Sequence, residues 1–327
     1  MTQLCPVPHP PRPPGEEPAV RDIILDPHSS DSSPASPILD LIALSERAAS
    51  VERHRRTPEL SIVVLAYQEE ARIGRSLVEL SAHLARTGRR GVEVVVVVAT
   101  RPDGTSDRTR EIVEGKQALF ENLRIVLPGA KAGKGRDAKY GMLVARGRMR
   151  IFMDADLATP LHHLQRAVEL AEAGNDAVLA VRDLTSSHRG LRRIISSAGN
   201  RLVQAVLLPG ISDTQCGFKL FSADAAEQVF RRQTIDGWGF DMEVLAVARR
   251  LGLGVATFDV PDWTDVPGGT FGDKAVAGAL RTLQDLMRIR WRVATGSYRH
   301  LQPLPAPTVV AWHREPAVER RLVSRAG

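Results

Sequence analysis

The segment Ile151-Phe152-Met153-Asp154-Ala155-Asp156-Leu157 decides the fold that we predict for this chain. Its apolar residues end abruptly in two carboxylates one residue apart, and the helix-breaking pair Thr159-Pro160 follows shortly after. Such a run is typical of a buried strand that delivers acidic side chains to the edge of a sheet. Ligands of open α/β sheets bind at that edge. We therefore take this segment as the centre of a ligand site.

The two acids suggest a metal site. Side chains at positions i and i+2 of a strand point the same way, so Asp154 and Asp156 can converge on one hard cation. Two carboxylates suit Mg²⁺ or Mn²⁺, which complete their coordination with water and substrate phosphates. The alternative is that the pair only ends a strand and caps the next helix, with Pro160 in its first turn. A lone Asp-x-Asp favours this alternative because short motifs have many false positives, so the context has to decide.

The whole chain has the composition of a globular protein. Its 327 residues are 43% hydrophobic and 25% charged, enough for one large domain or two modest ones. The two cysteines, Cys5 and Cys216, argue against a disulfide framework and fit a reducing cytosol. No run approaches the ~18 apolar residues that span a bilayer, and the first residues lack the pattern of a secretory signal. We therefore expect a cytoplasmic protein, with any membrane contact peripheral and at the inner face.

The formal net charge of +6 points to an anionic partner. Nucleotides, lipid phosphates and nucleic acid all satisfy this condition. The basic residues are dispersed along the chain and no nucleic-acid recognition module is present, so nucleic acid is not an expected partner.

Composition and periodicity divide the chain into four parts. We predict a disordered Pro- and Ser-rich tail at residues 1–37, a short helix and linker at 38–58, the main domain at 59–292 and a loosely ordered tail at 293–327. For the short helix, docking on the body is favoured over a membrane anchor, because one short apolar face binds lipid weakly. Within the main domain, strand-like and helix-like patterns alternate from residue 61 to 182, which predicts an α/β fold with a mostly parallel sheet. The five valines at 94–98 predict a central strand that is buried on both faces.

Four segments at the ends of predicted strands, or in loops, are candidates for one composite site. They are residues 66–70, 100–109, 129–139, and 213–219 together with 238–243. Each also has an ordinary explanation as a helix cap, a turn, a solvated basic loop or the cover of a core edge. In the third segment, glycines that expose backbone amides, basic residues and a helix N-terminus together suit phosphate. It is not a P-loop, because Gly135 stands where that motif requires Ser or Thr.

The order of the motifs adds a resemblance. Ala-Tyr-Gln-Glu-Glu, Asp-Gly-Thr-Ser-Asp, Gly-Lys-Gly, Phe-Met-Asp-Ala-Asp-Leu and Asp-Thr-Gln-Cys-Gly-Phe-Lys-Leu-Phe follow one another along the chain. Over about residues 60–290 this series resembles the family 2 inverting glycosyltransferases of GT-A fold. The last motif is most similar to the dolichyl-phosphate glucosyltransferase and polyprenyl-phosphate sugar synthase branch. The resemblance implies a Rossmann-like, mostly parallel central sheet flanked by helices.

The resemblance also implies a nucleotide-sugar donor of the UDP-glucose or GDP-mannose type, and of these we expect glucose from UDP-glucose. Mg²⁺ or Mn²⁺ would lie on the diphosphate and neutralise the departing nucleotide. Relatives usually carry two adjacent acids in the second loop, whereas here Pro102 precedes Asp103, which leaves the choice of base open. The implied donor residues are Tyr67, Glu69 and Asp103 near the nucleoside, Lys134 and Asp154 near the phosphates, and Asp154 and Asp156 on the metal.

The acceptor stays open between two chemistries. A polyprenyl or dolichyl phosphate offers an oxygen that is already anionic, and Arg189, Arg192, Arg193 or Lys219 would hold it. A soluble small-molecule acceptor offers a hydroxyl, whose proton a carboxylate such as Asp213 or Asp241 must take. A hypothesis of another class is a non-catalytic nucleotide-sugar-binding protein on the same scaffold, motivated by the altered loop at residues 100–103.

Overall fold

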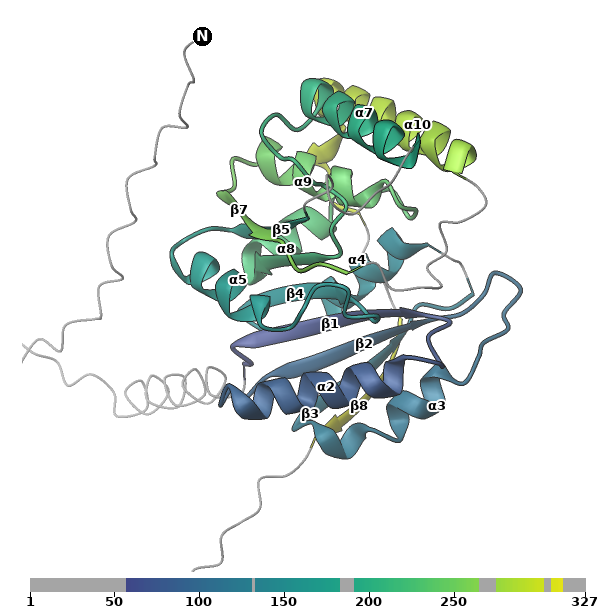
Figure 1. Ribbon diagram of the computed structural model, residues 1–327, viewed down its shortest axis with the longest axis vertical. Helices are drawn as coiled ribbons and strands as arrows, with labels where there is room; N and C mark the ends of the chain where they lie inside the picture. The colour runs from purple at the N-terminus through teal and green to yellow at the C-terminus, as the bar shows by residue number, and fades with distance from the viewer. Residues whose placement is uncertain (1–56, 131–132, 183–190, 265–274, 303–306, 314–327) are drawn as a thin grey trace, which may run out of the picture. The chain divides into compact units, whose positions relative to one another are not determined.

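A computed structural model describes residues 57–130, 133–182, 191–264, 275–302 and 307–313 (Figure 1). The tail predicted at 1–37 and nearly all of the helix and linker predicted at 38–58 lie outside these residues. The fold below concerns the unit Pro58–Gly327.

One eight-stranded sheet, in the order β7-β5-β6-β4-β1-β2-β3-β8, forms the centre of the described part. Strands β1 to β5 and β7 run in one direction, whereas β6 and β8 pair antiparallel with their neighbours. The predicted α/β fold with a mostly parallel sheet is confirmed. The strands are β1 Leu60–Tyr67, β2 Glu93–Ala99, β3 Asn122–Leu127, β4 Met149–Asp154, β5 Ala177–Arg182, β6 Phe218–Ser222, β7 Val255–Val260 and β8 Thr308–His313.

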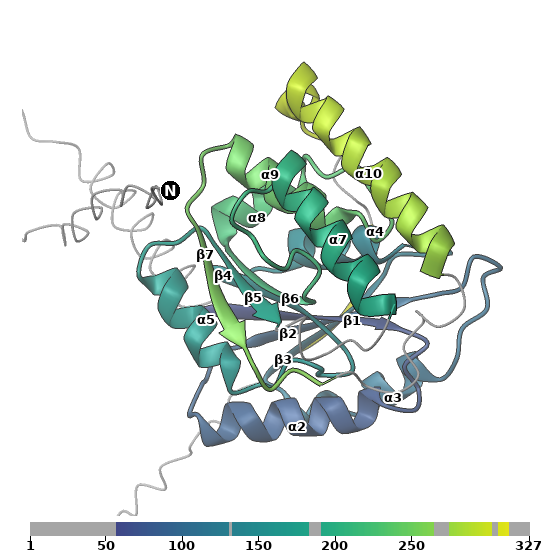
Figure 2. The same ribbon diagram turned by 45° about the horizontal axis from the view of Figure 1, so that its top comes forward.

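Helices cover both faces of this sheet (Figures 1 and 2). Helices α2, α3 and α5 pack on one face, and α4, α8 and α9 pack on the other. Helix α10 lies against α9 and beside α7, and both views show α7 and α10 next to each other. The helices are α2 Ile73–Arg86, α3 Thr109–Glu114, α4 Lys134–Val144, α5 His163–Glu172, α7 Leu191–Val206, α8 Ala223–Phe230, α9 Phe240–Arg250 and α10 Ala275–Thr295, with 3₁₀ turns at Gln117–Leu119 and Ser297–Arg299.

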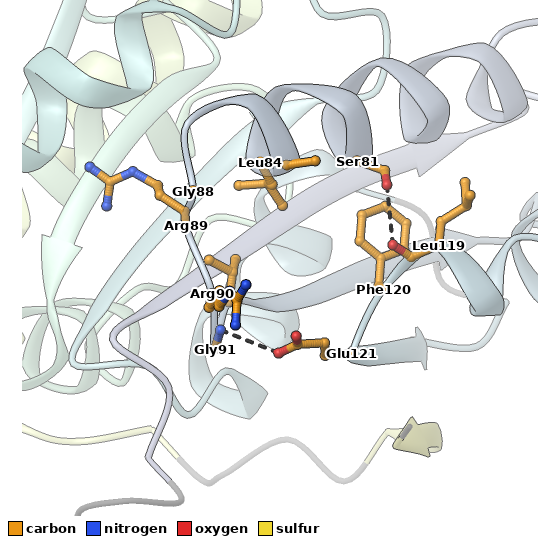
Figure 3. A pocket seen from close by; sticks show the side chains of 11 residues that line it. Ser81, Leu84, Gly88, Arg89, Arg90, Gly91, Leu119, Phe120 and Glu121 are labelled. Atoms are coloured by element: carbon orange, nitrogen blue, oxygen red, sulfur yellow. Dashed lines mark hydrogen bonds between the residues drawn. The ribbon is translucent and has the colours of Figure 1, made fainter. Parts of the chain in front are cut away.

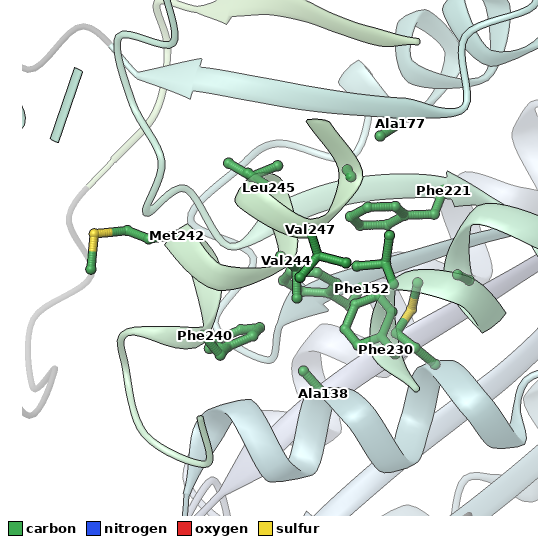
Figure 4. Close-up of a cluster of buried hydrophobic side chains, with 14 of the residues drawn as sticks. Ala138, Phe152, Ala177, Phe221, Phe230, Phe240, Met242, Val244, Leu245 and Val247 are labelled. Atoms are coloured by element: carbon green, nitrogen blue, oxygen red, sulfur yellow. The ribbon is translucent and has the colours of Figure 1, made fainter. Parts of the chain in front are cut away.

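The strand period places alternate side chains in two apolar clusters, one on each face. Val63, Val95 and Phe152 belong to the cluster under α4, α8 and α9, while their chain neighbours belong to the other. Figure 4 shows Phe152 of β4 among the rings of the first cluster, with its centroid 6.3 Å from Phe230 and 5.7 Å from Phe240. This packing fixes the strand that ends in the two acids. All five valines of β2 are buried, as predicted for a central strand.

Two strands were not predicted. Phe218–Ser222 forms β6 between β4 and β5, although its sequence follows a polar, glycine-bearing loop. Thr308–His313 forms β8 on the edge of β3, and α10 continues to Thr295. The boundary predicted at residue 292 is therefore too early, and the stretch 293–327 is not simply a loose tail. Both strands are short and owe their existence to a partner far away in the chain, which local periodicity does not reveal.

Candidate active site

The carboxyl ends of β1, β2, β4 and β5 meet at one edge of the sheet, because these strands run in the same direction. The antiparallel strand β6 begins at this edge, next to the end of β4. The topology therefore collects the segments after Tyr67, Ala99, Asp154 and Arg182 and the segment before Phe218 into one region. This is the edge at which ligands bind in open α/β sheets.

Lys134 and Asp154 form the centre of the site. The Lys134 Nζ lies 2.7 Å from Oδ1 and 2.9 Å from Oδ2 of Asp154, and 4.9 Å from the ring centroid of Trp238. Burial lowers the pKa of Lys134, but the carboxylates of Asp154 and Asp241 outweigh it and hold that pKa above its usual value. Lys134 therefore stays charged, as a group that neutralises phosphate must.

Asp156 adds a second carboxylate to this edge, so the negative charge there is not balanced by Lys134 alone. Burial and the neighbouring charge of Asp154 raise the pKa of Asp156 above its ordinary value, against the effects of the Ala158 amide, Lys134 and Arg72. Its Oδ1 accepts a hydrogen bond from the Ala158 N–H at 3.1 Å. Two crowded carboxylates made only of hard oxygen donors are a donor set that fits Mg²⁺ or Mn²⁺, and a cation would relieve their repulsion.

Backbone strain marks the same edge. Within the described ranges, the non-glycine residues with positive φ are Gln68 at 58° and Leu157 at 54°, each just beyond the end of a strand, β1 and β4 respectively. Such conformations cost on the order of 1 kcal/mol or more and cluster at ligand sites. Neither amide atom of Gln68 has a hydrogen-bond partner in this part of the chain.

Gly217 lets β6 approach the acids. A Cβ at this position would stand 2.0 Å from Oδ2 of Asp154, a distance that no side chain tolerates. The glycine in the Cys-Gly-Phe-Lys motif is therefore needed to seat the Asp154 carboxylate.

The basic glycine loop differs from its prediction. The amides of Gly135 and Arg136, expected to be exposed to phosphate, donate instead to the Asp236 carbonyl at 2.8 and 3.2 Å. A Cβ on Gly135 would stand 2.5 Å from the Ile235 carbonyl oxygen, so this glycine serves close packing of α4 against the segment before α9. The predicted use of these two amides is wrong, because that segment occupies them. The Lys134 side chain remains the basic group of this loop that reaches the acids.

The first two strand-end loops are tied to each other. The Glu70 N–H donates to Asp107 Oδ2 and the Arg108 N–H donates to Glu70 Oε2, both at 3.0 Å. Glu69 pairs with Arg72 at 2.8 Å, and its pKa is raised by burial, with the charges of Asp156 and Asp154 adding to the effect. Glu69 therefore lies near the acid pair, and its contact with a nucleoside stays a prediction.

Two predicted donor residues are more open. Tyr67 is exposed at the end of β1. Asp103 is exposed in the second loop, where its Oδ1 accepts hydrogen bonds from Thr105 N and Oγ1 at 2.9 and 2.7 Å. These hydrogen bonds hold the pKa of Asp103 below its usual value. Asp103 closes a turn in this structure, and its contact with a nucleoside stays a prediction.

The three residues predicted as catalytic lie inside the protein. Lys219 (0% exposed) pairs with Asp241 (1% exposed) and donates to the Cys216 carbonyl at 2.6 Å. Asp213 accepts from Arg182 Nε at 2.6 Å and Nη2 at 3.0 Å. Burial raises the pKa of Asp213, but Arg182 and two backbone amides outweigh it and lower that pKa. Both pairs border the site without facing solvent.

The sequence did not predict that Arg182 and the segment after β7, which packs on it, belong to the site. The guanidinium lies 5.0 Å from the ring centroid of Trp263, just beyond β7. Asp262, the preceding residue, contacts His163 Nε2 at 2.6 Å and His162 Nε2 at 3.2 Å. These contacts clamp the segment after β7 to the start of α5. Like Asp154, Arg182 is a charged residue at the end of an apolar run, and this pattern could have identified it from the sequence.

The predicted acceptor arginines are only partly described. Arg189 lies outside the described residues, and the side chains of Arg192 and Arg193, in the first turn of α7, are outside them as well.

A separate hollow lies at the opposite edge of the sheet. Figure 3 shows it between the end of α2 and the segments that precede β2 and β3. Its volume is about 550 Å³. The Ser81 hydroxyl donates to the Leu119 carbonyl at 3.1 Å beside it, and the Gly91 N–H donates to Glu121 at 3.4 Å. None of the predicted site residues lines it. It faces the amino ends of the parallel strands, so we place the active site elsewhere.

Comparison with solved structures concerns the fold. Mannosyl-3-phosphoglycerate synthase from Rubrobacter xylanophilus matches with a TM-score of 0.54 and 16% identity, over 81% of this chain and 82% of its own. Glucosyl-3-phosphoglycerate synthase from Mycobacterium tuberculosis, in complex with Mn²⁺, UDP-glucose and phosphoglyceric acid, matches with a TM-score of 0.53 and 18% identity, over 74% and 83%. At this identity the likeness shows the fold, which is the GT-A glycosyltransferase fold.

Sequence comparison identifies the family. Dolichyl-phosphate beta-glucosyltransferases are 33% identical to this chain in Drosophila melanogaster and 27% in Homo sapiens, each over 258 residues. The aligned part covers 74% of this chain, 77% of the fly protein and 78% of the human one. The model of glycosyl transferase family 2 matches residues 61–230, just over half of the chain. This chain therefore belongs to glycosyl transferase family 2 and is a glycosyltransferase.

Proposed function

We propose that this protein transfers a hexose from a nucleotide sugar to a polyprenyl or dolichyl phosphate with inversion at the anomeric carbon. UDP-glucose is the first donor to test, and Mg²⁺ or Mn²⁺ is the proposed cofactor. The observation that carries the proposal is the strand edge at which Lys134 meets the paired carboxylates of Asp154 and Asp156. The names of the relatives, dolichyl-phosphate beta-glucosyltransferases, support the lipid phosphate as acceptor.

Each group at the edge has a proposed task. Tyr67, Glu69 and Asp103 border the nucleoside, because they lie on the two loops that are tied together at the ends of β1 and β2. Lys134 neutralises the diphosphate, which its raised pKa permits. A divalent cation on Asp154 and Asp156 would neutralise charge on the departing nucleoside diphosphate.

The acceptor decides whether a base is required. An acceptor phosphate oxygen attacks the anomeric carbon opposite the leaving group, the bond to the diphosphate breaks, and the nucleoside diphosphate leaves with the electron pair. No proton has to be removed from an anionic oxygen. We propose that Arg189, Arg192 and Arg193 hold this phosphate, since they follow β5 in the chain and guanidinium forks match phosphate.

A soluble acceptor with a hydroxyl remains the second candidate. In that case Asp241 is a better proton acceptor than Asp213, because burial raises the pKa of Asp241 whereas Arg182 holds the pKa of Asp213 low. Asp241 would have to exchange its pairing with Lys219 for a contact with the acceptor. We propose that Lys219 and the Arg182–Asp213 pair act as positioning residues that hold β6 and the loop before it.

The direct test is transfer of radiolabelled glucose from UDP-glucose to polyprenyl phosphate in the presence of Mg²⁺ or Mn²⁺. We expect labelled lipid from the wild type and loss of at least about a hundredfold in kcat from Asp156→Ala, since a lost charge stabiliser costs a few kcal/mol. Asp224→Asn, an exposed acid in the first turn of α8, is the matched control and should behave as the wild type.

The outcomes separate the alternatives. Labelled lipid that persists undiminished in Asp156→Ala would remove the metal role. Transfer only to hydroxyl acceptors would replace the lipid phosphate with a soluble acceptor. Nucleotide-sugar binding measured by calorimetry, without transfer to any acceptor, would leave a non-catalytic binding protein.

A further inference from the structure

Helix α10 carries an uncovered apolar stripe. Leu280, Leu283, Met287 and Trp291 are 58%, 43%, 57% and 63% exposed. They are three, four and four positions apart, so at 3.6 residues per turn they lie within an arc of about 80°. Four large apolar side chains exposed in one line differ from the scattered exposed apolar residues of ordinary surfaces. We name these four residues the α10 stripe.

The opposite side of α10 is firmly docked. Leu286 and Ile289 are buried in the apolar cluster that also contains Phe240 of α9. Asp285 lies so close to Gly239 that a Cβ there would stand 2.3 Å from its carboxylate. The α10 stripe is therefore the outward face of a well-packed helix.

Arginines flank the stripe on both sides. Arg290 falls on one side of the arc, and Arg281 and Arg288 fall on the other; all three are exposed. Helix α7, which lies beside α10, has three arginines and no acidic residue, and α10 has four arginines and one aspartate. Seven arginines against one aspartate give this helix pair a net charge of +6, equal to the formal net charge of the whole chain.

We propose that the α10 stripe and its flanking arginines form the surface by which this protein lies on an anionic lipid bilayer. An amphipathic helix with large apolar residues on one face and arginines beside them sinks into the headgroup region, where the arginines reach lipid phosphates. Tryptophan is favoured at that depth. Among the described residues no helix is both long and apolar enough to cross a membrane. The contact proposed here is interfacial.

The charges argue against a second copy of the chain as the partner that covers the α10 stripe. A two-fold interface pairs a surface with itself, so it would bring the +6 of one α7–α10 pair against the +6 of another. An anionic lipid surface complements the same charges.

The stripe is also connected to the active site. Asp285, on the inner side of α10, packs on Gly239 in the loop that carries Trp238 and leads into Asp241. A protein that rests on α10 therefore holds the loop beside Lys134 near the bilayer. The inference stands on α10 itself and does not depend on the identity of the acceptor.

The test is flotation of the full chain with vesicles. We expect binding to vesicles of equal parts phosphatidylcholine and phosphatidylglycerol, weaker binding at high salt and little binding to pure phosphatidylcholine. The variant Leu283→Gln/Met287→Gln/Trp291→Gln should bind the anionic vesicles at least about tenfold more weakly, because three large apolar side chains no longer leave water on binding. Val78→Gln, an exposed apolar residue on α2, is the matched control.

The inference would be overturned if the wild type did not float, or if the stripe variant floated as well as the wild type. It would also be overturned if neither protein bound vesicles and sedimentation showed a wild-type dimer that the stripe variant does not form. All substituted side chains are already exposed, so the variant should keep the unfolding midpoint of the wild type, which thermal unfolding checks.

Glucose transfer to a short-chain, water-soluble polyprenyl phosphate separates this inference from the proposed function. Unchanged transfer in the stripe variant, with reduced transfer to acceptor embedded in vesicles, supports both. Flotation without any transfer would support the membrane-binding surface and contradict the proposed transfer to a lipid phosphate.

Discussion

The sheet edge that carries Asp154 and Asp156, which we call the acid edge, differs from the buried ion pairs nearby. Both contain aspartates and basic residues, but only the ion pairs have one basic residue for each aspartate. At the acid edge, Lys134 pairs with Asp154, and burial together with the charge of Asp154 raises the pKa of Asp156. Two other ion pairs are matched one to one. Lys219 of β6 and Asp241 of α9 are both fully buried, and Asp213, in the loop before β6, is buried against Arg182, whose side chain is 17% exposed. A cation from outside would complete the first arrangement, whereas the second is complete without one. In the function that we propose, the first group of residues binds the donor and the second holds the site in place.

The largest expected effect comes from breaking a complete pair. Lys219→Met leaves the Asp241 carboxylate buried without its partner, which should lower the free energy of unfolding by about 3–5 kcal/mol. The double variant Lys219→Met/Asp241→Leu should recover most of this loss, because no buried charge is left. Chemical denaturation of both variants and the wild type measures the effect.

Asp156→Asn at the acid edge is the control for this prediction. It removes one of two repelling carboxylates, so the free energy of unfolding should stay the same or rise. A loss at Asp156 equal to the loss at Lys219 would contradict the distinction between the two regions. Transfer by the double variant would exclude Lys219 and Asp241 from catalysis.

Asp137 on α4 is an intermediate case, buried like the pairs but without a matched cation. Burial raises the pKa of Asp137 from 3.8 to about 7, and its Oδ1 has no partner within the described residues. The folded state thus binds this proton more tightly than the unfolded state, so stability falls as pH rises from about 4 to about 7. Asp137→Asn should equal the wild type near pH 4 and exceed it by up to about 4 kcal/mol at pH 8. Unfolding at both pH values checks this, and a constant difference between the two proteins would contradict it.

The smallest effect concerns cation binding at the acid edge. Because the pKa of Asp156 is raised, its proton competes with the cation at a pH above that of an ordinary aspartate. As the pH is lowered, the affinity for Mn²⁺ should therefore begin to fall while the pH is still above 3.8, and below the raised pKa it should drop about tenfold per pH unit. Calorimetry over a pH series measures it, with Asp224→Asn as the control. An affinity that stays constant down to the ordinary aspartate range would show that the two acids do not share the cation.

Local patterns succeeded where the chemistry is local. The apolar run predicted the strand that ends at Asp154, and the alternation of strands and helices predicted the parallel sheet, because both depend on neighbours a few residues away. Asp156 follows in a turn, so the i and i+2 spacing of a strand does not describe it. The same patterns failed for β8, whose six residues are a strand only through β3, nearly two hundred positions earlier. They also failed for Gly135, since a glycine needed for close packing and one that exposes amides look alike in sequence.

By itself, the sequence determined the fold class, the family and the presence of two acids and a lysine in segments that follow strands. Periodicity and residue chemistry are local properties, so they can be read from the sequence. Tertiary structure alone decided which charges are matched. It placed Lys134 on Asp154, closed Lys219 on Asp241 and Arg182 on Asp213, and turned the apolar line of α10 outward. The physical reason is that pairing and burial depend on distances between segments far apart in the chain, and those distances arise only when the core packs.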